Sequence, residues 1–173
     1  MHVIQYVAVK ASSVESAHER VHNYLETELE GSPWFDWFVA GGGRWATNVA
    51  DNQYNQNWTG DIAPLGDPRF SDYLDKAKQY RRETLAEYKS EAGDIDLASI
   101  VTGLDTWDGS NADYSVTHTM YALKRIYEIT SGTWDSDSYF FDVENESTNM
   151  VHMQLSLDNG DKDWYIVPVD FHF

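Results

Sequence analysis

The chain contains no cysteine, and it is poor in basic residues. The lack of cysteine excludes disulfides, thiolate zinc sites and cysteine nucleophiles. Only 12 lysines and arginines stand against 29 aspartates and glutamates, which gives a formal net charge of −17. Such a charge opposes binding to nucleic-acid backbones and anionic membranes, because both are polyanions. It favours cationic partners, metal ions, or a surface that imitates a polyanion, and high salt in the source organism would also explain it.

Long apolar runs are also missing. No stretch approaches the length of a transmembrane helix, and residues 1–6 lack the basic start and apolar core of a signal peptide. We therefore expect a cytoplasmic protein that does not bind membranes. The length of 173 residues fits one domain, residues 1–173, and no linker of disordered composition divides it.

The pattern of apolar residues predicts an α+β fold. Runs of β-forming residues predict strands over residues 3–9, 34–39, 139–143, 150–157 and 164–173. Apolar residues at helical spacing predict helices over residues 14–29, 68–92 and 113–130. The Asn159-Gly160 pair predicts a tight hairpin between the last two strands. This order predicts an antiparallel β-sheet with about three helices packed on one face.

The densest cluster of unusual residues is the stretch from Trp34 to Trp45, which holds five aromatic residues and three consecutive glycines. Glycine lets backbone N–H groups approach a ligand closely. We expect the N–H groups of Gly41, Gly42 and Gly43 to hold an anion, Arg44 to bind it through its guanidinium, and Trp34 or Trp45 to stack on the ligand. The alternative is a glycine hinge at a strand end, with Arg44 paired to a surface acid.

A second candidate site involves histidines. Asp170 and His172 lie on the same side of the last predicted strand, and His2 begins the first. If these strands pair, His2 and His172 converge, and with Asp170 they would bind a divalent metal or act as acid and base. The alternative is a set of exposed polar positions on a sheet. The acidic loops 135–137 and 158–163 would bind calcium or magnesium at most weakly, and we expect no other cofactor.

The sequence Trp34-Phe35-Asp36-Trp37-Phe38-Val39-Ala40-Gly41-Gly42-Gly43-Arg44-Trp45 resembles a group of small, uncharacterised proteins encoded by bacteriophages. These proteins share a Trp-Asp-Trp-aromatic stretch that leads into Gly-Gly-Arg-Trp. The closing Val167-Pro168-Val169-Asp170-Phe171-His172 also resembles their C-terminal strand. The resemblance implies a phage origin and a role in the host cytoplasm during infection, and it brings no established activity.

Three functions follow from these observations. The first is a non-enzymatic protein that binds a small phosphate-bearing ligand, such as a nucleotide, or a host factor, in counter-defence. The second is an acidic DNA mimic that inhibits a cationic host protein. The third is a phosphoesterase or metal-dependent hydrolase based on histidine and aspartate. The expected partners are thus a small anionic ligand or a host protein, without direct nucleic-acid binding, and assembly into a homo-oligomer is left open.

Overall fold

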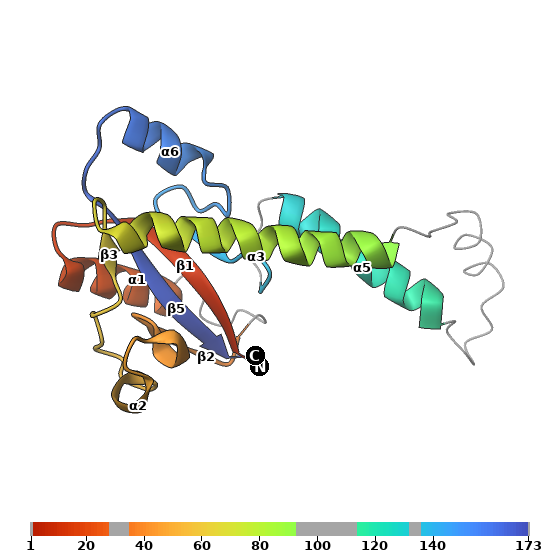
Figure 1. The fold of residues 1–173 in the computed structure, drawn as a ribbon, viewed down its shortest axis with the longest axis horizontal. Coiled ribbons are helices and arrows are strands. Elements are labelled where there is room, and N and C mark those ends of the chain that lie inside the picture. The colour runs from red at the N-terminus through yellow and green to blue at the C-terminus, as the bar shows by residue number, and fades with distance from the viewer. Residues whose placement is uncertain (1, 28–34, 93–113, 132–135, 173) are drawn as a thin grey trace.

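The computed structural model describes residues 2–27, 35–92, 114–131 and 136–172. A mixed β-sheet lies at its centre, with helices on both faces (Figure 1). The α+β class predicted from the sequence is confirmed. Within these ranges, no helix combines the length and the apolar character that crossing a membrane requires.

The two longest strands form the middle of the sheet. β1 (His2–Lys10) and β5 (Trp164–His172) run antiparallel and are paired from end to end. β2 (Trp37–Ala40) and β3 (Ala63–Pro64) pair with different parts of β5. β4 (Phe140–Asp142) lies parallel to β1 on its other side. The sheet, which was expected to be antiparallel throughout, therefore contains one parallel pair.

The pairing of β1 with β5 brings the two ends of the described chain together. His2 lies opposite His172, and Lys10 lies opposite Trp164. The N- and C-terminal ends consequently meet at one end of the sheet (Figure 1). Residues that are far apart in the sequence thus share a surface there.

Helix α1 (Val14–Thr27) covers one face of the sheet. The hydroxyl oxygen of Ser13 accepts a hydrogen bond from the N–H of Ser16 at 3.1 Å, which is the side-chain contact of an N-cap. Buried residues recur every four positions and form one stripe along the helix: Ala17, Val21 and Leu25. This stripe packs against buried residues of three strands: Val7, Val9, Phe38, Val167, Val169 and Phe171.

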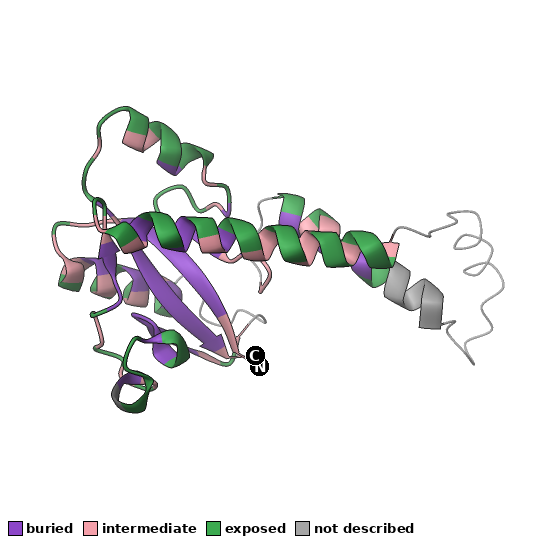
Figure 2. Cartoon of the chain, in the orientation of Figure 1, coloured by how far each residue is buried: buried purple, intermediate pink, exposed green. Residues whose placement is uncertain are grey.

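Helix α3 (Pro68–Ala92) covers the opposite face. Proline suits the first helical turn, where its missing N–H would have no partner. Buried residues are confined to the first half of the helix: Phe70, Tyr73, Leu74 and Ala77. Beyond them, α3 extends past the sheet and packs against α5 (Tyr114–Ser131), as Figures 1 and 2 show.

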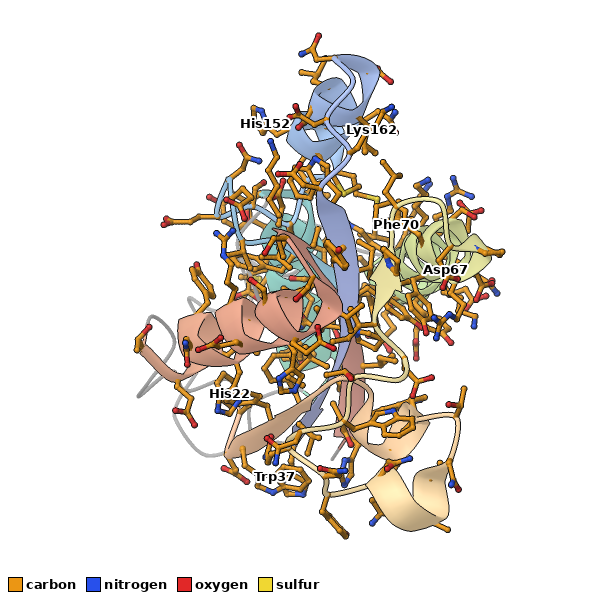
Figure 3. All side chains as sticks on the ribbon, turned by 90° about the vertical axis from the view of Figure 1, so that its left-hand side faces the viewer. His22, Trp37, Asp67, Phe70, His152 and Lys162 are labelled. Carbon is orange, nitrogen blue, oxygen red and sulfur yellow. The ribbon has the colours of Figure 1, made fainter. Side chains whose placement is uncertain are left out.

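Helices therefore flank the sheet on both sides, as the edge-on view in Figure 3 shows. The prediction that they pack on one face is wrong. In β1, Val7 and Val9 belong to the core under α1, whereas Tyr6 and Ala8 belong to the core under α3. Alternate residues of a strand face opposite sides. A strand that is apolar at nearly every position is consequently buried on both faces.

Residues 150–157, which were predicted to form a strand, instead form helix α6 (Val151–Asp158). The side-chain oxygen of Asn149 accepts the N–H of Val151 at 3.0 Å, at the start of the helix. Met153 is buried, whereas Val151 and Leu155 are each 53% exposed. The alternation of apolar residues in this stretch does not mark the buried face of a strand.

The hairpin predicted at Asn159-Gly160 is absent for the same reason. Gly160 has a φ of 93° and donates its N–H to the carbonyl of Leu157 at 3.0 Å. It therefore ends α6 before the chain enters β5.

The segment between β2 and β3 positions the glycine stretch. It contains a 3-10 helix, η1 (Gly43–Trp45), and the short helix α2 (Val49–Asn52). η1 packs against β5 near Asp170. This contact places the predicted glycine site beside the predicted histidine site.

Candidate functional site

The glycine bend, Gly41 to Gly43, leads from β2 into η1. Its three residues have positive φ angles of 93°, 127° and 50°, which residues with a side chain rarely adopt. A Cβ at Gly41 would lie 1.9 Å from the carbonyl oxygen of Trp58, and a Cβ at Gly43 would lie 2.3 Å from the Cβ of Asp170. The glycines thus allow the bend to pack closely against the protein itself.

Three N–H groups of the bend and of η1 donate to acceptors inside the protein. The N–H of Gly41 donates to the carbonyl of Pro168 at 2.8 Å. The N–H of Arg44 donates to Oδ2 of Asp170 at 2.8 Å, and the N–H of Trp45 donates to a carbonyl of the bend at 2.9 Å. Of the three amides predicted to hold an anion, that of Gly41 thus already has a partner within the protein, as do the two amides that follow the bend.

A second buried carboxylate, Asp61, holds the other side of the bend. Its Oδ2 accepts the N–H of Thr47 at 3.0 Å and the indole N–H of Trp58 at 2.6 Å. Its backbone carbonyl accepts the hydroxyl of Tyr73 on α3 at 2.9 Å, and burial raises the pKa of Tyr73 to about 12. A Cβ at Gly42 would lie 3.3 Å from Oδ2 of Asp61. The bend is therefore fixed between two carboxylates.

Two of the predicted anion-binding side chains remain accessible. Arg44 is exposed, and its guanidinium makes no hydrogen bond or ion pair with the described residues. Trp45 is 40% exposed. Trp34, the other ring that was predicted to stack, lies outside the described residues. The alternative of Arg44 paired to a surface acid is likewise not seen in the described ranges.

The predicted histidine group does converge at the end of the sheet. Asp170 is fully buried, and its Oδ1 lies 2.9 Å from Nδ1 of His2. A carboxylate accepts, so Nδ1 of His2 is the donor in this contact. The rings of His2 and His172 lie 5.0 Å apart, edge to face. Nδ1 of His172 lies 3.3 Å from Oδ2 of Asp36 without hydrogen-bond geometry.

Aromatic rings surround these histidines. The ring of Trp37 stacks on His172 with 5.1 Å between centroids and 8° between planes. His2 meets Trp37 edge-on at 5.5 Å and Trp45 at 6.4 Å. Figure 3 shows Trp37 at one end of the molecule, beyond the helices that flank the sheet. The exposed end of the sheet is therefore an aromatic and imidazole surface.

A cavity of about 380 Å³ opens beside His2. It lies between the start of β1 and the middle of α3, and its size falls in the range of ligand pockets. Its described lining consists of His2, Val3, Ile4, Trp45, Tyr80, Glu83, Thr84, Glu87 and Tyr139. Glu83 and Glu87 belong to this lining, and no lysine or arginine among the described residues does.

The contribution of α3 to this cavity was not predicted. Glu83 and Thr84 lie three and four positions after Tyr80, and Glu87 lies four positions after Glu83 and three after Thr84, which places the four residues on one face of the helix. That spacing was the available signal. It remained hidden because the same helix carries alternating charges that suggest a solvated surface.

One lining residue, Tyr139, has an unusual backbone. Its φ is 54°, which is rare for an aromatic residue. Its hydroxyl lies 3.2 Å from Oγ1 of Thr84, and its ring lies 5.5 Å from that of Tyr80. Burial raises the pKa of Tyr139 above its usual value, so the hydroxyl stays protonated at neutral pH. The cavity thus offers neutral hydroxyls and rings beside its two carboxylates.

A further histidine pair was missed in the sequence. His18-Glu19-Arg20-Val21-His22 has the H-E-x-x-H spacing found on the zinc-binding helices of metalloproteases. In α1 the two imidazoles stack at 6.1 Å with 7° between their planes. Nε2 of His18 lies 3.3 Å from the carbonyl of Ala40, and Nε2 of His22 lies 3.4 Å from Oε1 of Glu26. The two nitrogens therefore face different protein partners.

Metal binding finds little support elsewhere in the described residues. They contain no group of three or more histidine or acidic side chains arranged to hold a metal ion. In the loop 158–163, Oδ2 of Asp161 lies 2.6 Å from Nζ of Lys10. In the loop 135–137, Asp137 accepts a hydrogen bond from Nε of Arg125 at 3.0 Å, and Asp135 lies outside the described residues.

Comparison of the chain with models of known protein families, with curated proteins and with solved structures finds no match. What the site binds is therefore inferred from its own geometry and charge.

Proposed function

We propose that this chain is a non-enzymatic binding protein that captures a positively charged side chain of a protein partner in the cavity beside His2. The observation that carries the proposal is the lining of that cavity. Two carboxylates, Glu83 and Glu87, and the rings of Trp45, Tyr80 and Tyr139 share one space of about 380 Å³.

This combination suits a guanidinium or an ammonium group. The face of an aromatic ring attracts a cation within about 6 Å of its centroid. Carboxylates one helical turn apart add charge-assisted hydrogen bonds, for which the planar guanidinium is well shaped. The net charge of −17 draws cations toward the whole protein. An arginine or lysine side chain is therefore favoured over a phosphate.

The anionic ligand expected from the sequence is a second candidate, because the Arg44 guanidinium has no partner among the described residues. Its weakness is the use of the neighbouring amides by Asp170 and Asp61. An anion would rely on Arg44, with Trp45 to stack on an attached ring. Adenosine monophosphate is a suitable probe for this alternative.

The first test is an NMR titration with Nα-acetyl-L-argininamide. We expect shifts at the Trp45 indole and a dissociation constant that rises about 5- to 30-fold in a Glu83→Gln/Glu87→Gln variant, since each surface ion pair contributes about 0.5–1 kcal/mol. The matched control is Glu19→Gln/Asp163→Asn, which changes the net charge equally at two exposed positions away from the cavity.

The two variants separate local capture from the acidic decoy. An equal loss of affinity for the arginine probe in both variants would mean that overall charge determines binding, as expected of a DNA mimic. It would contradict capture in the cavity. Binding of adenosine monophosphate that is lost in Arg44→Ala, without binding of the arginine probe, would overturn the proposal in favour of an anion site.

The resemblance of Trp34–Trp45 to phage proteins suggests a setting for this binding. In that setting the captured residue belongs to a host protein, and capture serves the phage during infection. The origin and the counter-defence role stay predictions from the resemblance. A pull-down from host lysate, with the Glu83→Gln/Glu87→Gln variant as control, tests them.

A further inference from the structure

Within the described part of the chain, one edge of β1 lacks a strand neighbour beside the cavity. β5 pairs with β1 over its whole length, from His2 to Lys10. On the other side, β4 pairs only with Tyr6 to Ala8. Among the described residues, no strand lies beside His2 to Gln5 on that side.

The peptide groups of His2 and Ile4 face this open edge. The N–H of Tyr6 donates to the carbonyl of Tyr139, and the carbonyl of Ala8 accepts from Val143, so both peptide groups point toward β4. The direction in which peptide groups point alternates along a strand with a period of two residues. His2 and Ile4 therefore point the same way, and their N–H and C=O groups have no partner among the described residues.

The chain ahead of β4 turns away from this edge. Tyr139, with its φ of 54°, marks the point of departure. Two residues earlier, Asp137 accepts hydrogen bonds from the hydroxyl of Tyr88 on α3 and from Arg125 on α5. The segment 136–139 is thus held by the helices, and β4 does not continue alongside His2 and Ile4.

The open edge and the cation cavity are adjacent, because His2, Val3 and Ile4 line the cavity. Ile4 belongs to the core on the α3 face. In an added strand, the side chains on that same face would point toward α3, where Glu83 and Glu87 lie. An exposed strand edge supplies main-chain hydrogen bonds, and a pocket beside it selects alternate side chains.

We propose that an extended basic segment of a protein partner adds to the sheet as a strand beside His2–Gln5, with an arginine or lysine side chain seated between Trp45, Glu83 and Glu87. The proposal rests on the proposed function and deepens it. Charge favours this occupant, since the cavity lining carries two carboxylates and the chain carries a net charge of −17.

The probe is an acetylated and amidated eight-residue peptide of alternating arginine and serine. It is compared with Nα-acetyl-L-argininamide and with two N-methylated versions of the peptide. One version is methylated on the backbone nitrogen of every arginine, and the other on the backbone nitrogen of every serine. In an added strand the backbone N–H groups of one residue type face β1, and those of the other face solvent. We expect one methylated peptide to lose affinity about tenfold or more and the other to bind like the parent.

Amide hydrogen exchange supplies the second readout. The N–H of Ile4 should exchange about tenfold more slowly when the parent peptide is bound, because it gains an acceptor. The N–H groups of Val3 and Gln5 face β5 already and serve as internal controls. Equal effects of the two methylated peptides, or unchanged exchange at Ile4, would overturn strand addition.

The two proposals fail separately. If Nα-acetyl-L-argininamide binds in a manner that depends on Glu83 and Glu87, but the methylated peptides behave alike, capture of a cation stands and strand addition is wrong. If neither the small probe nor the peptide binds, the proposed function itself is wrong.

Discussion

The carboxylate of Asp170 accepts a hydrogen bond from the N–H of Arg44 at 2.8 Å, across 126 residues of sequence. Its other oxygen lies 2.9 Å from Nδ1 of His2. One buried side chain thus fixes both η1 and the imidazole that lines the cavity. The protein thus places a buried carboxylate directly beside the glycine bend that was expected to hold a phosphate.

Replacement of Asp170 by asparagine should therefore destabilise the fold. An asparagine has one acceptor oxygen, so either the Arg44 amide or the His2 ring would face an NH2 group. We expect a loss of about 1–3 kcal/mol in the free energy of unfolding, measured by urea denaturation. Asp163→Asn, at an exposed position, should change it by less than about 0.5 kcal/mol. Similar values for the two variants would contradict a structural role for Asp170.

The glycine bend makes a separate prediction. Alanine at Gly43 should destabilise the protein more than alanine at Gly160, although both glycines have positive φ. The added Cβ would lie 2.3 Å from Asp170 at the first position and would meet nothing within 4 Å at the second. The backbone term is about 1–2 kcal/mol in each, and overpacking adds about 1–3 kcal/mol at Gly43. Equal losses in urea denaturation would show that the bend can move away from Asp170.

Much of the fold could be predicted because its signals are local. Helix α3 begins at Pro68 and ends at Ala92, as the proline and the apolar spacing predicted. β1 and β5 also match their predicted ranges closely. The strand prediction over residues 150–157 was wrong. Alternation of apolar and polar residues over so short a stretch does not distinguish a strand from a helix that buries only Met153.

The candidate site was harder to predict because it depends on pairs far apart in the sequence. The meeting of His2 with His172 followed from strand pairing and is confirmed. The partners of the Arg44 amide could not be read locally, since Asp170 reaches it only after β5 has paired with β2. Glu83 and Glu87 likewise reach the cavity only because α3 packs beside β1, and no local sequence pattern predicts this packing.

The contacts that hold residues 136–139 away from the open edge of β1 can be tested at Arg125. This residue is 5% exposed, and its guanidinium binds Asp137 and, at 2.8 Å, Oε2 of Glu128. Arg125→Ala should lower the free energy of unfolding by about 2–4 kcal/mol, because it leaves partly buried carboxylates without their ion-pair partner. Lys124→Ala, at the adjacent and exposed position of α5, should cost less than about 0.5 kcal/mol. Comparable losses in a urea titration would mean that Arg125 does not anchor the segment ahead of β4.

The histidine pair of α1 predicts a dependence of stability on pH. Burial between α1 and β2 lowers the pKa of His18 below its usual value of 6.5, and the charge of His22 adds to the effect. The folded protein therefore prefers neutral His18, whereas the unfolded chain takes up the proton near pH 6.5. The contribution of His18 is complete above that pH and is lost as the pH falls toward the lowered pKa. The difference in unfolding free energy between wild type and His18→Gln should thus shrink between pH 7.5 and pH 5.5, whereas the exposed His152→Gln should show no such trend. Parallel curves for wild type and His18→Gln would show that His18 takes up its proton equally in the folded and unfolded states.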